Sequence, residues 1–240
     1  MATKKRGQQK RRRPISNSKM VEVQPLTENQ ERIFKAWDEG KHLFIYGAAG
    51  TGKTFCALYK ALQDTLKDVP SYDAVYLVRS LVATREIGFL PGDHEDKSSL
   101  YQIPYKNMVK YMFECPNDSE FETLYGSLKT QETIKFWSTS FLRGVTLDNS
   151  VVIIDEMQNL SFHELDSIIT RVGENTRIVF CGDAMQTDLK NNNEKNGIHD
   201  FMRILEIMPD DFAMIEMGVD DICRSGLVRN YLIAKQSIRN

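Results

Sequence analysis

The sequence predicts an α/β protein built on a parallel sheet with helices on both faces. Three observations support this prediction: continuous apolar runs of strand length, segments of helical periodicity between them, and a glycine-rich loop directly after the first run. Continuous apolar runs are typical of parallel strands buried on both faces, and their alternation with helices is typical of this architecture. We therefore expect ligands to bind at the carboxyl edge of the sheet.

The expected elements follow one another with short connections, except in one region. The expected strands cover residues 43–46, 74–79, 151–156, 176–183 and 213–217. The expected helices cover residues 27–39, a segment after the glycine-rich loop that ends near residue 66, 161–171 and 227–235. Ser161 and Glu164 have the spacing of a capping box at the start of their helix. Residues 81–150 contain no clear sheet strand, and we interpret them as mainly helical.

The first 25 residues differ in composition from the rest of the chain. Residues 1–13 hold seven basic residues and no acid, so the remainder carries a net charge of about −9 within a total of −2. Such a basic run is expected to be disordered and to attract phosphate backbones without reading sequence. Alternatively it is a solvated tail, or it contacts the protein's own acidic surface. We expect a basic tail and linker over residues 1–25 and one domain over residues 26–240.

Composition excludes a membrane protein of ordinary type. No apolar stretch approaches the roughly 20 residues that cross a bilayer, and the basic N-terminus is not followed by the apolar segment of a signal peptide. The four cysteines are widely spaced and form no Cys-x-x-Cys pair that would suggest zinc binding or redox work. We expect a cytoplasmic protein with reduced thiols.

The glycine-rich loop is the strongest functional signal. It reads Gly47-Ala48-Ala49-Gly50-Thr51-Gly52-Lys53-Thr54 and fits the phosphate-binding pattern G-x-x-x-x-G-K-[ST]. Glycines let backbone N–H groups close around an anion, and the following helix adds its positive end. Lys53 is expected to reach the β- and γ-phosphates of ATP, and the Thr54 hydroxyl to bind Mg²⁺. The alternative is a glycine-rich turn before a helix, without a ligand.

Two acids end the apolar run of residues 151–154. Asp155 and Glu156 are expected at the carboxyl edge of the sheet, with the phosphate loop. Asp155 would hold Mg²⁺, and Glu156 would orient and deprotonate the attacking water. An apolar run before two acids is also common at strand ends with no catalytic role. Together with the phosphate loop, the pair predicts hydrolysis of the nucleotide.

A third polar segment follows the strand expected at residues 176–183. Gln186 lies just beyond this strand, where an amide could sense the γ-phosphate or position the water. The alternative is a strand-to-loop turn in which Gly182 and Asp183 supply only backbone geometry.

At this point the sequence resembles the PhoH-like family, relatives of the superfamily 1 helicase core. The resemblance covers residues 26 to about 235 and depends on blocks in the order 26–30, 46–54, 87–93 with Lys97, 141–144, 155–159, 182–188 and 223–225. The block Gly-Phe-Leu-Pro-Gly-Asp within 87–93 is more specific than the phosphate loop. Ala48 replaces the family's usual proline and Met157 its usual alanine, and neither change removes a ligand.

The resemblance implies an ATP-binding protein, an ATP hydrolase with a connection to RNA, and we expect a RecA-like domain whose ATP hydrolysis is coupled to RNA or single-stranded DNA. It implies that Gln30 contacts adenine, although Thr27 and Gln30 also have capping-box spacing. It implies that Arg224 acts as an arginine finger, within the chain or across a subunit interface, although an ordinary surface arginine is the alternative. The family also implies a hexamer. A helicase-type motor closes two RecA-like domains on one nucleotide, and this sequence has residues for one such domain. In a hexamer a neighbouring subunit would supply the second side of the nucleotide site. Basic candidates for nucleic-acid contact are Arg79, Arg85 and Lys97, and the alternative for each is a solvated or ion-paired side chain.

Two other classes of protein share the phosphate loop. A small-molecule kinase would be expected to show an arginine-rich lid, and the sequence offers none. A nucleotide-gated oligomeric assembly or binding protein would bind ATP with little turnover. Glu156 argues against this class, and the turnover with and without nucleic acid would separate it from a stimulated ATPase.

Overall fold

The structure is a computed structural model that describes residues 15, 19–79, 94–142, 144–183 and 192–238. The predicted features that lie outside these residues are the basic tail, Arg85, Gln186 and the Gly-Phe-Leu-Pro-Gly-Asp block. Lys97 belongs to a described helix, but its side chain is not described.

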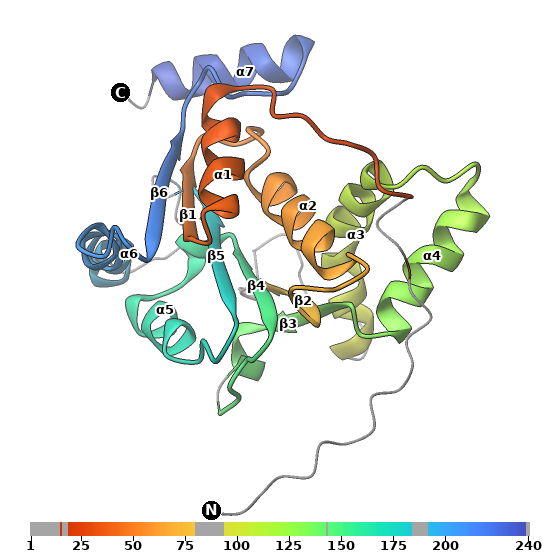
Figure 1. Cartoon of the computed structure of the whole chain (residues 1–240). Coiled ribbons are helices and arrows are strands. Elements are labelled where there is room, and N and C mark those ends of the chain that lie inside the picture. Colours follow the sequence, from red (N-terminus) through yellow and green to blue (C-terminus); the bar gives the residue numbers. More distant parts are fainter. Residues whose placement is uncertain (1–14, 16–18, 80–93, 143, 184–191, 239–240) are drawn as a thin grey trace, which may run out of the picture.

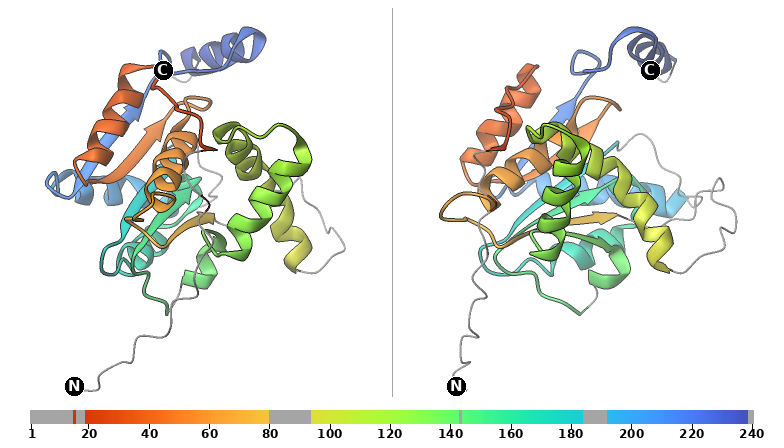
Figure 2. Two further views of the ribbon diagram at one scale, coloured as in Figure 1. Left: turned by 45° about the vertical axis from the view of Figure 1, so that its right-hand side comes forward. Right: turned by 90° about the vertical axis from the view of Figure 1, so that its right-hand side faces the viewer.

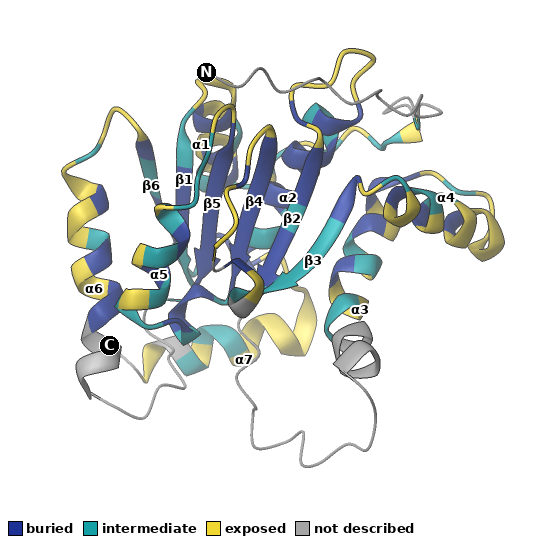
Figure 3. Ribbon diagram, turned by 90° about the horizontal axis from the view of Figure 1, so that it is seen from below, coloured by how far each residue is buried: buried dark blue, intermediate teal, exposed yellow. Residues whose placement is uncertain are grey.

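Six parallel strands form one sheet in the order β3-β2-β4-β5-β1-β6 (Figure 1). The strands are β1 (His42–Gly47), β2 (Ala74–Arg79), β3 (Ile134–Ser138), β4 (Ser150–Asp155), β5 (Arg177–Gly182) and β6 (Phe212–Met217). Every residue of β4 and β5 is buried, as Figure 3 shows for the middle of the sheet. The predicted parallel sheet is therefore confirmed, with continuous apolar runs at its centre.

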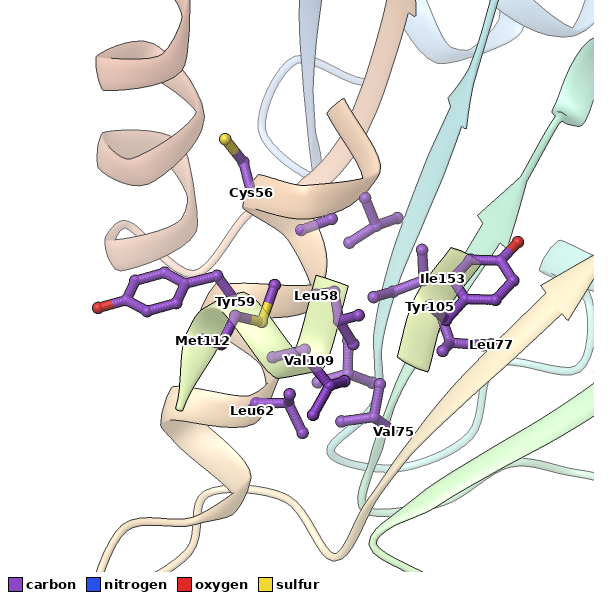
Figure 4. Packing of buried hydrophobic residues seen from close by; sticks show 14 of the residues in the cluster. Cys56, Leu58, Tyr59, Leu62, Val75, Leu77, Tyr105, Val109, Met112 and Ile153 are labelled. Atoms are coloured by element: carbon purple, nitrogen blue, oxygen red, sulfur yellow. The ribbon is translucent and has the colours of Figure 1, made fainter. Parts of the chain in front are cut away.

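Four helices cover one face of the sheet: α1 (Glu28–Asp38), α2 (Lys53–Thr65), α3 (His94–Met112) and α4 (Asp118–Thr130) (Figures 1 and 2). Leu62 of α2 and Val109 of α3 are fully buried and pack over Val75 and Ile153 of the sheet (Figure 4). The core on this face positions α2, whose first turn follows the phosphate loop.

Two helices, α5 (Phe162–Ile169) and α6 (Asn192–Glu206), cover the opposite face. Phe201 of α6 packs against Phe44 and Phe180, with ring centroids 6.3 and 5.1 Å away. The capping box of Ser161 and Glu164 is present at the start of α5, as the spacing predicted. Helices therefore cover both faces of the sheet.

The region between β2 and β4 corrects one prediction. Residues 81–150 were expected to be mainly helical, and α3 and α4 agree with this, but β3 lies between them and β4 and pairs with β2. β3 is an edge strand, paired on one side only, and four of its five residues are only partly buried. It therefore lacks the continuous apolar signal of the central strands.

Residues before position 26 are also hydrogen-bonded to the domain. The N–H of Val21 donates to the carbonyl of Met112 at 2.9 Å, and the N–H of Glu114 donates to Lys19 at 3.1 Å. The Tyr59 hydroxyl of α2 accepts from the N–H of Val23 at 3.1 Å. Part of the predicted linker thus lies along the C-terminal end of α3 and the middle of α2.

A last helix, α7 (Gly226–Ser237), lies at the end of the molecule next to the phosphate loop (Figure 1). Three of its apolar side chains are largely exposed: Leu227, Val228 and Tyr231. Among the residues that the structure describes, no helix combines the length and the apolar character needed to cross a membrane.

Candidate functional site

The candidate site lies at the carboxyl edge of the sheet, where β1, β5 and β4 are neighbours. β1 leads into the phosphate loop, β4 ends at Asp155, and β5 ends between them at Gly182. In parallel sheets this edge collects the loops that bind ligands. The topology thus brings together two motifs that lie a hundred residues apart in the sequence.

Three glycines of the phosphate loop, Gly47, Gly50 and Gly52, have positive φ values that favour glycine. Gly47 has φ of +112°, and a methyl group there would lie 2.2 Å from the carbonyl oxygen of Met217 in β6. Gly52 has φ of +83° and is the N-cap of α2, with no side-chain cap. The first N–H groups of α2 therefore remain available for an anion, as in other phosphate sites at helix N-termini.

Lys53 points back into the loop. Its ammonium donates to the carbonyl oxygens of Gly47 at 2.9 Å and Ala48 at 2.6 Å. Burial lowers the pKa of Lys53, although the nearby acids Asp183 and Glu156 counteract the shift. A partly desolvated cation in this position suits the phosphates of a nucleotide.

Thr54 and Asp155 form the candidate magnesium site. The Thr54 hydroxyl donates to Oδ1 of Asp155 at 2.7 Å, so the two predicted ligands are brought together by the fold. Carboxylate and hydroxyl oxygens fit Mg²⁺, which is commonly held by one or two such groups together with substrate phosphates. Among the described residues no group of three or more His, Cys, Asp or Glu could hold a metal ion.

Asp155 has a second partner that no motif predicted. The hydroxyl of Tyr105 in α3 donates to its Oδ2 at 2.7 Å, and Tyr105 is 3% exposed. Desolvation and the neighbouring Asp155 raise the pKa of Tyr105 well above its usual value, so the phenol stays protonated. No sequence motif marks Tyr105. It lies within residues 81–150, for which the sequence predicted only a mainly helical region.

Glu156 is held in a defined position. Its backbone is left-handed, with φ of 55° and ψ of 42°, and the amide of Gln158 donates to its Oε2 at 2.5 Å. The same Gln158 accepts from the N–H of Asp183 at 2.9 Å. Non-glycine residues in this conformation cluster at functional sites. Gln158 thereby connects the predicted base to the end of β5.

Gln30 is buried beside the phosphate loop. Its amide donates to the carbonyl of Thr51 at 3.0 Å and to the sulfur of Cys223 at 3.1 Å, and its oxygen accepts from the N–H of Leu26 at 2.8 Å. Its own N–H approaches the Thr27 hydroxyl at 3.4 Å. Gln30 therefore takes part in the N-terminal cap of α1 and is also hydrogen-bonded to the phosphate loop.

Arg224 lies over the phosphate loop of its own chain. The N–H of Cys223 donates to the carbonyl of Gly50 at 3.0 Å, and a methyl group on Gly50 would lie 3.0 Å from Cγ of Arg224. The segment before it is anchored to α1, because Asp221 accepts from the Thr27 hydroxyl at 2.5 Å and the Asn29 amide at 2.8 Å. Two distant parts of the chain thus meet at the loop.

Arg79 lies at the end of β2 in register with Asp155 of β4. Its guanidinium is over the ring of Tyr101 in α3, at 5.9 Å from the ring centroid. Arg79 is therefore at the same edge of the sheet as the candidate magnesium site.

Comparison with known proteins agrees with this arrangement. The family described as PhoH-like protein matches residues 22–235. The chain is 31% identical to a PhoH-like protein of Mycobacterium leprae over 207 residues, which are 86% of this chain and 56% of that protein. It is 32% identical to a PhoH-like protein of Synechocystis over 219 residues, 91% of this chain and 63% of that protein. The chain thus spans less than two thirds of these relatives.

Among solved structures, the chain is similar to the large terminase of a thermophilic bacteriophage. The TM-score is 0.51 with 9% sequence identity, over 88% of this chain and 50% of that chain. At this identity the likeness concerns the fold alone. Two findings lead to one conclusion. The family matches almost the whole domain, and the phosphate loop and the paired acids lie at one edge of the sheet. The fold is that of a RecA-like P-loop NTPase, and the chain belongs to the PhoH-like family.

Proposed function

We propose that the protein hydrolyses ATP with Mg²⁺ and that hydrolysis is coupled to RNA or single-stranded DNA. The observation that carries the proposal is the 2.7 Å hydrogen bond between Thr54 and Asp155. It joins the phosphate loop to β4 in the manner that a nucleotide-bound Mg²⁺ requires. Bound there, Mg²⁺ would neutralise charge on the β- and γ-phosphates.

Different residues of the site are proposed to bind the phosphates, hold the metal and accept the proton. The N–H groups of the loop and Lys53 bind the phosphates, and Thr54 and Asp155 hold the metal. Glu156 accepts a proton from water as the water oxygen bonds to the γ-phosphorus, and the bond from that phosphorus to the β–γ bridging oxygen breaks. The hydrogen bond from Gln158 keeps the Glu156 carboxylate oriented. Gln186 stays a predicted sensor of the γ-phosphate.

Arg224 is proposed to act within its own chain. A methyl group on Gly50 would lie 3.0 Å from Cγ of the Arg224 side chain, and the N–H of Cys223 beside it donates to the carbonyl of the same glycine. From this position the guanidinium would stabilise the phosphates directly. Gln30 is proposed to act on adenine only by exchanging one of its three side-chain partners, and its present bonds favour a role in shaping the loop.

The partner of the ATPase is proposed from charge and position. Arg79 lies at the site's edge, and the basic residues of 1–13 supply a sequence-independent attraction to phosphate backbones. We further propose a homo-oligomer, a hexamer by family resemblance, because α7 presents Leu227 and Tyr231 to solvent at 83% and 62% exposure. A cytoplasmic location remains a prediction from the sequence.

A nucleotide-gated assembly protein is the second candidate. One observation favours it: Leu232 of the exposed helix α7 would lie 3.1 Å from a methyl group on Gly50, so the helix lies beside the phosphate loop. Nucleotide binding could therefore order an interface on α7 without turnover.

The first experiment measures Mg²⁺-dependent release of phosphate from ATP, alone and with single-stranded RNA or single-stranded DNA. Glu156→Gln serves as the matched control, because it keeps the shape of the side chain and removes the base. We expect turnover that one polymer stimulates and that the control lacks. Turnover in Glu156→Gln equal to that of the wild type would refute the assignment of the base. An absence of turnover, with nucleotide-dependent assembly, would select the second candidate.

A further inference from the structure

Helix α3 brings a buried phenol to the candidate magnesium site. The two oxygens of Asp155 are held by residues of two different helices: Oδ1 by Thr54 of α2 and Oδ2 by Tyr105 of α3, each at 2.7 Å. Asp155 itself is 9% exposed. A carboxylate with both oxygens engaged has little freedom to rotate, so its orientation toward a metal is set before the metal binds.

Tyr105 is in turn fixed by its surroundings. Its ring packs against Phe136 of β3, with centroids 5.7 Å apart, and it belongs to the core between the sheet and α2, α3 and α4. One turn earlier, Tyr101 lies under the guanidinium of Arg79 at the end of β2. Two successive turns of α3 are thus anchored along the same edge of the sheet, and the position of the Tyr105 hydroxyl does not depend on one contact.

The direction of the contact is given by its geometry: the Tyr105 hydroxyl donates and Oδ2 of Asp155 accepts. Groups that hydrogen-bond a metal-binding carboxylate orient it, and their removal weakens metal binding or activity about 10- to 100-fold.

We propose that Tyr105 is a positioning residue for the magnesium-dependent step, acting through Asp155. The inference rests on the proposed ATP hydrolysis and adds a residue from outside the phosphate-binding motifs. Its role is to hold Oδ2 so that Oδ1 and the Thr54 hydroxyl face the metal together. Tyr105 is not expected to contact the nucleotide.

The test uses Tyr105→Phe, which keeps the buried ring and removes only the donor. Tyr125→Phe is the matched control: Tyr125 is a buried tyrosine of α4 whose hydroxyl has no hydrogen-bond partner among the described residues. The measurement is binding of a fluorescent ADP analogue, first with a chelator and then with increasing Mg²⁺. We expect Tyr105→Phe to bind normally without Mg²⁺ and to need about tenfold more Mg²⁺ for half of the metal-dependent gain. Tyr125→Phe should match the wild type in both conditions.

Asp155→Asn separates this inference from the proposed function. If Asp155→Asn loses the Mg²⁺ response while Tyr105→Phe keeps that of the wild type, the role of Tyr105 is refuted and the metal site stands. If neither variant changes the response, the metal site itself is refuted. Weaker binding of Tyr105→Phe in chelator would also overturn the inference, because it would indicate a general structural role.

Discussion

Gly182 is the last residue of β5, and the side chain of Gln158 occupies the space that a larger residue at this position would need. A methyl group on Gly182 would lie 2.3 Å from Oε1 of Gln158, whereas ordinary contact begins at 3.4 Å. Gly182→Ala would therefore displace the amide by about 1 Å. This shift breaks the 2.9 Å bond from the Asp183 N–H and disturbs the bond to Glu156. A 1 Å misplacement in a catalytic group can cost about 100-fold in rate.

The same substitution also overpacks the core. Met157 would be 2.7 Å away at Cγ and 3.0 Å at its backbone nitrogen, so both the side chain and the chain must move. Overpacking of this kind costs about 1–3 kcal/mol of unfolding free energy, or roughly 2–4 °C of Tm for each kcal/mol in a protein of this size. We thus expect two separate effects: a modest loss of stability and a large loss of kcat.

Gly197→Ala is the control that separates these effects. A methyl group at Gly197 in α6 would lie 2.8 Å from the backbone nitrogen of Phe162, so the overlap is comparable but involves neither Gln158 nor Glu156. Steady-state ATPase kinetics and thermal unfolding are measured for both variants. Gly182→Ala should lose kcat about 100-fold with the KM for ATP nearly unchanged, and Gly197→Ala should lose only Tm. Equal kcat in Gly182→Ala and wild type would refute the positioning of Glu156 through Gln158.

Three further predictions concern the nucleotide, the C-terminal segment and the tail. Lys53→Ala should abolish productive phosphate binding, and normal turnover in a binding and activity assay would contradict the assignment of the loop. Asp221→Asn should lower the unfolding free energy at neutral pH by about 2 kcal/mol through weakened bonds to a charged group. Burial tends to raise the pKa of Asp221, but hydrogen bonds from Thr27 and Asn29 outweigh it and lower the pKa below 3.8. The stabilisation is therefore present above the ordinary pKa of an aspartate and is lost as the pH falls through the lowered value, so thermal unfolding of variant and wild type should converge in acid. Deleting residues 1–13 should weaken nucleic-acid binding and flatten its dependence on salt, and an unchanged salt slope would remove the tail from the mechanism.

The central elements could be predicted from the sequence because their signals are local. β2 and β4 are continuous apolar runs, and the strand and helix around the phosphate loop follow from its pattern. β3 could not be predicted, since it mixes Lys135 and Ser138 with apolar residues and gains its stability by pairing with β2. α6 begins with a run of polar residues, Asn192 to Asn196, and is likewise not among the predicted elements.

The candidate site divides in the same way. Thr54 and Asp155 were each predicted from their motifs as ligands of Mg²⁺; that role stays a prediction, and the fold brings the two side chains within 2.7 Å of each other. The contributions of Tyr105 and Gln158 depend on distances across the sheet edge that no spacing in the sequence encodes. Such supporting residues can be found only once the packing of the helices on the sheet is known.

The order of the strands has a consequence for the timing of synthesis. β1, which carries the phosphate loop, pairs only with β5 and β6, and Gly47 at its end lies beside Met217. These two residues are 170 positions apart in the chain. At 5–20 residues per second, roughly 10–30 s pass on the ribosome between them. The phosphate loop is thus synthesised well before the strands that pair with β1, and the close approach of Gly47 to Met217 cannot form until β6 has emerged.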